Sequence, residues 1–160
     1  MRRLFIVFAV LSAYLAGAVA SAGRAQADLL IGIDKSTQRM AVTVNGVHRY
    51  TWAISTGLGG GPPSGSFEPE RLERTWHSRK YDWAPMPHAI FFYHGYAIHG
   101  TYQVSRLGRR ASHGCVRLHP ANAATLFALV QSHGKRNTHI VVSDTRMVAG
   151  RPAGRTTASR

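Results

Sequence analysis

The hexapeptide Ser-His-Gly-Cys-Val-Arg at residues 112–117 contains the single cysteine of this 160-residue chain. A cysteine becomes a nucleophile when a base removes its proton, because the thiolate is the attacking species. A free thiol has a pKa of about 8.5, so an unassisted cysteine is mostly protonated at neutral pH. The glycine before the cysteine lets the backbone approach a substrate or adopt a positive φ angle. This arrangement points to acyl-transfer chemistry at Cys115.

The backbone around the cysteine favours the same chemistry. We expect the consecutive N–H groups of His113, Gly114 and Cys115 to point into one concavity, a nest that binds a developing oxyanion. An ordinary turn before a helix would explain the glycine, but not a lone cysteine with Arg117 two positions later. From these residues alone, an inert buried thiol and an intermolecular disulfide remain alternatives.

A nucleophilic thiol needs a base, and the chain has nine histidines. Two of them, His94 and His99, each precede a glycine in FFYHGYAIHGTY. His99 lies at the end of a predicted strand, where a side chain can be held rigidly. A competing interpretation is a metal site formed by His94, His99, His113 and Cys115. It is less favoured, because the spacing gives neither an H-x-x-x-H nor a C-x-x-C pair.

The first 27 residues have the pattern of a secretory signal peptide. Arg2 and Arg3 precede an apolar run over residues 4–20, and Ala-Gln-Ala at 25–27 fits a cleavage site. A retained membrane anchor is the alternative, but the run is short and interrupted by polar residues. We expect cleavage after Ala27, or near residue 20 or 22, and export across the inner membrane to the periplasm or cell wall. An exported chain with one cysteine cannot form an internal disulfide.

The chain is strongly basic, with 20 Lys and Arg against 7 Asp and Glu and a net charge of +13 at pH 7. Such a net charge indicates which partners the protein could bind and says little about its fold. An exported protein rarely meets nucleic acid, so we expect none as a partner. Anionic cell-wall polymer or acidic phospholipid headgroups fit better, and a solvated basic surface without a specific partner is the alternative. Residues 146–160 have four arginines and no acid, and are predicted to be a disordered tail.

The N-terminal half of the mature chain predicts strands. Residues 29–34 read as a short buried strand. Residues 39–54 alternate apolar and polar positions on both sides of Asn45-Gly46, which predicts a hairpin with a type I′ turn. The segment rich in Gly and Pro at 55–67 predicts a long loop. Residues 68–88 predict irregular structure.

The C-terminal half predicts a second hairpin, one helix and a last strand. Residues 89–93 and 96–100 form the predicted antiparallel pair, and residues 138–144 the final strand. Residues 120–133 predict a helix that begins at Pro120 and stops at Gly134. Its expected apolar face comprises Ala124, Phe127, Leu129 and Val130. Together these elements predict that residues 28–145 form a mostly β domain, with mixed sheets in a sandwich or barrel and one main α-helix after the cysteine.

The chain resembles a known family in the residues that carry the chemistry. Ile-His-Gly-Thr at 98–101, followed by Ser-His-Gly-Cys-Val-Arg at 112–117, resembles the signature of YkuD-type L,D-transpeptidases, the cysteine enzymes that remodel bacterial peptidoglycan. Residues 33–57 resemble the first strands of that domain. The PPSGSF segment at 62–67 is similar to its Pro-Thr-Gly-type loop. The likeness covers about residues 29–143.

The resemblance implies roles for the matching positions. Cys115 would be the nucleophile, His99 the base, and the Gly100 carbonyl the group that orients the imidazole. The pocket and its oxyanion site would be shaped by Ser112, His113 and Gly114. Arg117 would bind or orient a substrate carboxylate, although many relatives have Asn at this position.

The segment 68–88 would correspond to a lid over the cleft, with Trp76, Tyr81 and Trp83 as its walls. His94 matches no role of the family and is interpreted as structural. The resemblance implies no metal or organic cofactor.

The implied reaction is attack by the thiolate on the carbonyl before the terminal D-Ala of a peptidoglycan stem tetrapeptide. The resulting thioacyl enzyme would pass its acyl group to an amine acceptor, giving a 3→3 cross-link or an anchored partner. Water as acceptor would give an L,D-carboxypeptidase or endopeptidase of the same fold. A non-catalytic cell-wall-binding module is the other alternative. The resemblance also implies acylation by carbapenems.

Overall fold

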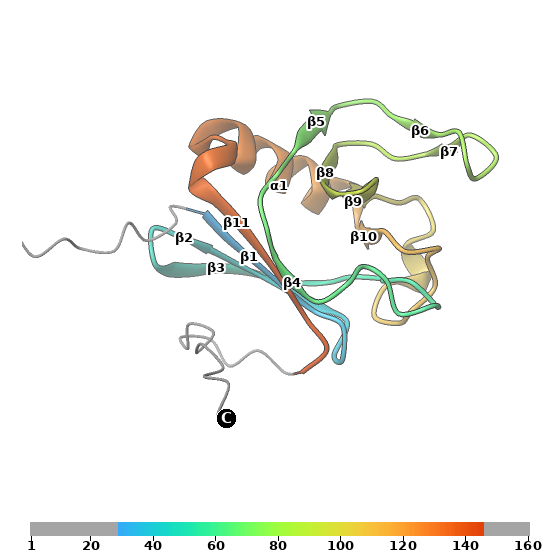
Figure 1. The fold of residues 1–160 in the computed structure, drawn as a ribbon, viewed down its shortest axis with the longest axis horizontal. Helices are drawn as coiled ribbons and strands as arrows, with labels where there is room; N and C mark the ends of the chain where they lie inside the picture. Colours follow the sequence, from blue (N-terminus) through green and yellow to red (C-terminus); the bar gives the residue numbers. More distant parts are fainter. Residues whose placement is uncertain (1–28, 146–160) are drawn as a thin grey trace, which may run out of the picture.

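The computed structural model describes residues 29–145, so the predicted signal peptide and basic tail lie outside the described residues. The described chain folds into a five-stranded sheet, a four-stranded sheet and one α-helix (Figure 1). A two-stranded ribbon, β6 (His77–Ser78) with β7 (Ala84–Pro85), extends from the four-stranded sheet. The predicted class, mostly β with a single main helix, is confirmed.

The five-stranded sheet has the order β3-β2-β1-β11-β4. Its strands are β1 (Leu29–Asp34), β2 (Arg39–Val44), β3 (Val47–Ala53), β4 (Gly65–Phe67) and β11 (Thr138–Ser143). The central strands β1 and β11 are parallel, whereas the other neighbours are antiparallel. Asn45 and Gly46 have φ angles of 49° and 76°, which confirms the predicted turn between β2 and β3. Strand β4 lies inside the segment predicted to be only loop.

The four-stranded sheet has the order β10-β9-β8-β5. Its strands are β5 (Arg71–Glu73), β8 (Ala89–Tyr93), β9 (Tyr96–Gly100) and β10 (Val116–Leu118). The predicted antiparallel pair β8–β9 is confirmed, and its turn is His94-Gly95, with φ angles of 39° and 85°. Strand β10 was not predicted. It runs parallel to β9, which places the end of the cysteine segment beside His99.

The helix α1 (Pro120–His133) has the predicted bounds. Pro120 occupies its first turn, and the His119 side chain accepts a hydrogen bond from the Ala121 N–H. Gly134, with a φ of 83°, ends the helix and donates to the Val130 carbonyl. The predicted apolar face is partly wrong, because the buried positions are Ala123, Leu126, Phe127 and Val130, whereas Ala124 and Leu129 are only partly buried.

One hydrophobic core joins the helix to both sheets. Its buried residues include Ile31 of β1, Ile90 of β8, Ile98 of β9 and Leu126 of α1. Burying an aliphatic side chain of this size contributes about 1.5–3 kcal/mol, so this core is the main source of stability. Because β9 and β10 also belong to it, the side chains on their opposite face stand on a rigid support.

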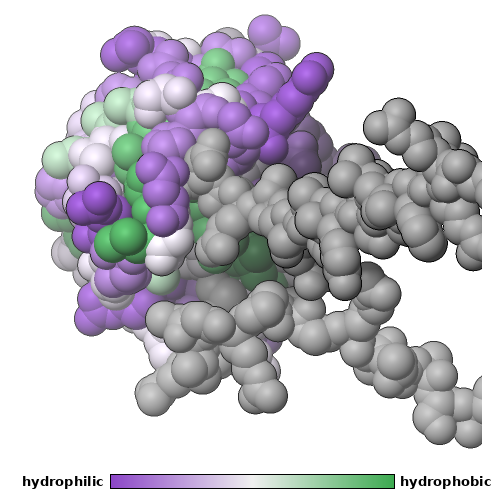
Figure 2. Space-filling view, turned by 90° about the vertical axis from the view of Figure 1, so that its left-hand side faces the viewer, coloured by the Kyte–Doolittle hydropathy of each residue, from purple (hydrophilic) through white to green (hydrophobic). Residues whose placement is uncertain are grey.

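Figure 2 views the left-hand side of Figure 1 and shows hydrophobic surface between polar groups. Exposed apolar side chains are common on folded domains, because polar side chains cannot cover the whole surface. No helix within residues 29–145 is long and apolar enough to cross a membrane.

Candidate active site

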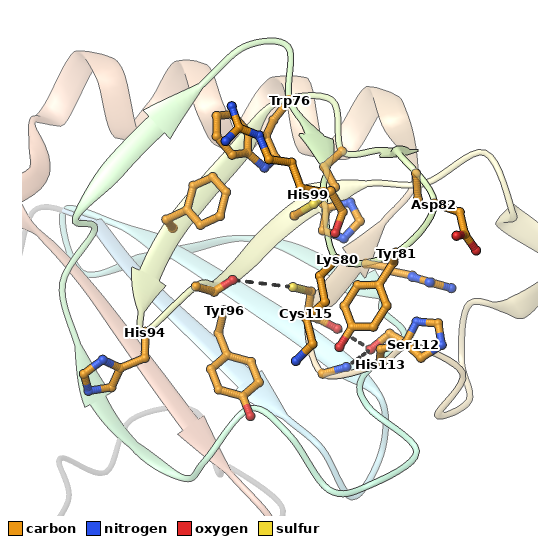
Figure 3. Close-up of a pocket in the computed structure, with 18 of the residues that line it drawn as sticks. Trp76, Lys80, Tyr81, Asp82, His94, Tyr96, His99, Ser112, His113 and Cys115 are labelled. Atoms are coloured by element: carbon orange, nitrogen blue, oxygen red, sulfur yellow. Dashed lines mark hydrogen bonds between the residues drawn. The ribbon is translucent and has the colours of Figure 1, made fainter.

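The register of two parallel strands brings His99 and Cys115 to one face of the four-stranded sheet. Arg117 of β10 pairs with His99 of β9, and Val116 pairs with Ile98. Cys115 stands immediately before β10, and its side chain faces the same cavity as that of His99. Both line one pocket of about 820 Å³ (Figure 3).

The imidazole of His99 is hydrogen-bonded to the carbonyl of Gly100, the group that the family resemblance implied. Its Nδ1 lies 2.7 Å from the Gly100 carbonyl oxygen. Because a carbonyl only accepts, Nδ1 carries the proton and Nε2 is left as an acceptor. Burial, with a smaller contribution from the Arg117 charge, lowers the pKa of His99 to about 4, and the Gly100 hydrogen bond opposes part of the change. The ring is therefore neutral at neutral pH and able to take a proton.

The Cys115 thiol is protonated in the resting protein. Burial raises its pKa above the ordinary value, and the Ala97 N–H and the Arg117 charge oppose that change only in part. The sulfur lies 4.0 Å from the Gly95 carbonyl oxygen, which accepts a weak S–H hydrogen bond. Thiol and imidazole thus rest as a neutral pair, and charge separation must accompany the reaction.

Ser112 closes the turn that carries the cysteine. Its buried hydroxyl donates to the Cys115 carbonyl at 2.6 Å and accepts from the Gly114 N–H at 3.0 Å. The predicted nest of three free N–H groups is therefore wrong at Gly114, because that donor is already used inside the turn. Ser112 acts on the pocket by fixing the backbone.

Gly114 occupies a position that no other residue fits. Its φ is 149°, and a Cβ there would lie 2.7 Å from Cε1 of Tyr96. From the other side, a Cβ on Gly57 would lie 2.8 Å from the Gly114 Cα. The cysteine turn is thus packed between an aromatic ring of β9 and the glycine-rich loop that follows β3. The predicted need for glycine here has a steric cause.

The segment between β5 and β8, which the family resemblance implies to be a lid, forms one wall of the pocket. Trp76 and Tyr81 line the pocket. The Tyr81 ring stacks on His113, with centroids 4.3 Å apart and planes 10° apart. Trp83 does not line the pocket and is 65% exposed, because the chain turns at Asp82 and Trp83 with φ angles of 46° and 53°. The prediction that Trp83 is a wall is wrong.

Arg117 lines the pocket beside His99, its partner on the neighbouring strand. Its Nη1 donates to the Gln103 side-chain oxygen at 3.2 Å and to the Ala111 carbonyl at 3.4 Å. Two anchors on one nitrogen leave the other guanidinium N–H groups for a ligand. With Arg79 and Lys80 also lining the pocket, its charge is predominantly positive. This lining suits a substrate that carries carboxylates.

Several pocket residues could not be found from the sequence. They include Met86, Phe91, Gly95, Tyr96 and Gln103. His94 lines the edge of the pocket from the β8–β9 turn, which explains the first His-Gly pair as turn geometry. In residues 29–145, no three His, Cys, Asp or Glu side chains lie close enough to bind a metal ion together.

A comparison with family models assigns the class. Residues 28–149 match the YkuD L,D-transpeptidase catalytic domain. The match covers most of the chain, and the protein belongs to this family. Curated proteins give no match.

Solved structures share the fold. An L,D-transpeptidase from Mycobacterium smegmatis superposes with a TM-score of 0.63 at 24% identity, covering 72% of this chain and 58% of the other. The L,D-transpeptidase LdtMt1 in complex with imipenem gives 0.64 at 26% identity, covering 72% and 59%. The enzyme from Xylanimonas cellulosilytica gives 0.62 at 25% identity, covering 75% and 62%. The chain thus spans less than two thirds of the chains it matches.

Proposed function

We propose that this protein is a peptidoglycan L,D-transpeptidase that uses Cys115 as its nucleophile. The observation that carries the proposal is the neutral, oriented imidazole of His99 on the same pocket face as the only thiol of the chain. A binding module would need neither a nucleophile nor a base. Family membership supports the reaction class, acyl transfer from one amine to another.

The first half-reaction transfers an acyl group to sulfur. As the Cys115 sulfur attacks the carbonyl before the terminal D-Ala of a stem tetrapeptide, Nε2 of His99 accepts the thiol proton. The tetrahedral intermediate then collapses, the C–N bond breaks, and the imidazolium returns the proton to the departing D-Ala nitrogen. A thioester on Cys115 and free D-Ala result. Nδ1 stays bonded to the Gly100 carbonyl, which stabilises the positive ring while it exists.

The second half-reaction reverses the steps of the first, with a different amine as the attacking group. The acceptor amine loses a proton to His99 and attacks the thioester carbonyl, and the sulfur leaves with that proton. The product is an amide that joins two stem peptides or anchors another acceptor. We propose the Cys115 N–H as the principal oxyanion donor, because the Gly114 N–H is already bonded to Ser112.

The substrate and location follow from the same proposal. Stem peptides carry carboxylates, and Arg117 together with the basic lid residues Arg79 and Lys80 suits them. The signal-peptide pattern supports export to the periplasm or cell wall, where peptidoglycan lies. The net charge of +13 would also favour approach to anionic wall polymer or an acidic membrane surface.

The test is incubation of the purified protein with disaccharide-tetrapeptide, followed by mass spectrometry of the products. We expect a cross-linked dimer with release of D-Ala. Formation of the hydrolysed tripeptide alone would assign a carboxypeptidase. The Cys115→Ala variant should give neither product, and D-Ala release by a folded Cys115→Ala protein would refute the assignment of the nucleophile.

A further inference from the structure

A buried glutamine outside the pocket is joined to the cysteine turn by hydrogen bonds. Gln38 lies in the turn between β1 and β2, has a φ of 53° and is only 5% exposed. Its Oε1 accepts from the Thr56 N–H at 2.8 Å, and its Nε2 donates to Thr56 Oγ1 at 2.7 Å. The same Nε2 donates to the Lys35 carbonyl at 2.8 Å. Both ends of the amide are therefore used, which fixes its orientation.

Thr56 links Gln38 to the segment that precedes the cysteine. It is fully buried, and its carbonyl accepts from the Ala111 N–H at 2.9 Å and the Ser112 N–H at 3.0 Å. The Ser112 hydroxyl then bonds both Gly114 and Cys115. An unbroken series of hydrogen bonds thus leads from Gln38 to Cys115.

Segment 55–57 also supports the turn from its other side. The Ser55 carbonyl accepts from the Arg117 N–H at 2.8 Å, and Ser55 donates back to the Arg117 carbonyl at 3.0 Å. Gly57 lies against Gly114. One short segment, 55–57, therefore contacts both flanks of the cysteine. The Gln38 side chain is hydrogen-bonded to Thr56, the middle residue of that segment.

We propose that Gln38 is a positioning residue that sets the place of Cys115 relative to His99. The imidazole is fixed by β9 and the Gly100 carbonyl, whereas the cysteine turn depends on segment 55–57 and hence on Gln38. A buried amide is costly unless every hydrogen bond is made, and an apolar side chain would fill this site without that requirement. This inference rests on the proposed function for its kinetic effect, because the distance matters only if the two groups react together.

The sharpest variant is Gln38→Met, which keeps the length of the side chain but removes all three hydrogen bonds. Thr56→Val is the graded variant, since it removes only the hydroxyl and leaves the backbone N–H and carbonyl of the series intact. Val130→Ala is the matched control, because it opens a cavity in the core at α1, and Val130 makes no hydrogen bond to Gln38, Thr56 or Ser112 within residues 29–145. Thermal unfolding of each variant would first show that it is folded at the assay temperature.

With stem tetrapeptide as donor, Gln38→Met should lower kcat about 10- to 100-fold and leave KM within twofold. A misplacement of about 1 Å has an effect of this size, and the pocket walls that bind substrate do not rest on Gln38. Thr56→Val should lose less than Gln38→Met. Val130→Ala should keep kcat within twofold of the wild type, even if its Tm falls as far as that of Gln38→Met. A Gln38→Met enzyme with kcat within twofold of the wild type would overturn the proposal.

A second readout does not depend on the substrate. The rate of Cys115 alkylation by iodoacetamide, followed between pH 6 and 10, reports the environment of the thiol. Release of the turn in Gln38→Met should expose the sulfur and raise the rate at pH 7 at least fivefold, with Val130→Ala unchanged. Overlapping profiles for wild type and Gln38→Met would overturn the proposal. A wild-type protein that is inactive on tetrapeptide would instead refute the proposed function and leave this measurement valid.

Discussion

Acidification should destabilise this protein in part through a buried imidazole, that of His99. Burial lowers the pKa of its imidazole from 6.5 to about 4. The unfolded chain therefore binds a proton at a higher pH than the folded chain. The contribution of the neutral His99 imidazole to the free energy of unfolding is fully present above pH 6.5 and is lost as the pH falls towards about 4. At 1.36 kcal/mol for each pKa unit, the loss amounts to about 3 kcal/mol.

The assay is urea unfolding at intervals between pH 4 and pH 7, followed by tryptophan fluorescence. The perturbation is His99→Gln, which keeps a hydrogen-bond donor for the Gly100 carbonyl but cannot titrate. The difference in unfolding free energy between wild type and variant should fall by about 3 kcal/mol from pH 7 to pH 4. Asp34 and Asp144, whose pKa values are also lowered, contribute to both proteins and cancel in this difference. Parallel pH profiles for the two proteins would refute the burial of a neutral imidazole.

Three further outcomes are expected. Gly114→Ala should lower kcat at least tenfold, because its Cβ would lie 2.7 Å from the Tyr96 ring, whereas Gly108→Ala, at φ 88° in open space, should lose only stability. Tyr81→Ala should raise KM several-fold through loss of the stack on His113, and Tyr81→Phe should behave as wild type; equal KM values for the three would remove Tyr81 from the pocket wall. The rate of Cys115 alkylation by iodoacetamide should rise steadily with pH and still be rising at pH 9, since burial raises the thiol pKa, and a rate independent of pH from 6 upward would show a preformed thiolate instead.

Much of the fold was predictable because local patterns agree with the tertiary structure. The turn at Asn45-Gly46 and the helix from Pro120 to Gly134 both depend on the φ angles that Asn, Gly and Pro prefer. Strands β4 and β10 could not be predicted in this way. Each has three residues, too few for alternation to show, and each exists only because a distant strand supplies its partner.

The site was predictable where chemistry selects the residue type. A lone thiol, a His-Gly pair and the Ser-His-Gly-Cys-Val-Arg segment identified Cys115 and His99 as candidates, and the structure places both in one pocket. Gln38 and Thr56 gave no signal, because a polar residue in a turn or loop is ordinary in sequence. Their burial and mutual hydrogen bonds arise only when the segments meet in three dimensions. Trp83 was wrongly included, since composition does not show which way a turn directs its side chains.

The central claim, that Cys115 is the acylated residue, is tested most directly by intact-protein mass spectrometry after incubation with imipenem. One adduct per chain is expected, mapped by peptide analysis to Cys115. It should be absent in Cys115→Ala and form more slowly in His99→Gln. No adduct on the folded wild-type protein, or an adduct that persists when Cys115 is replaced, would contradict the account.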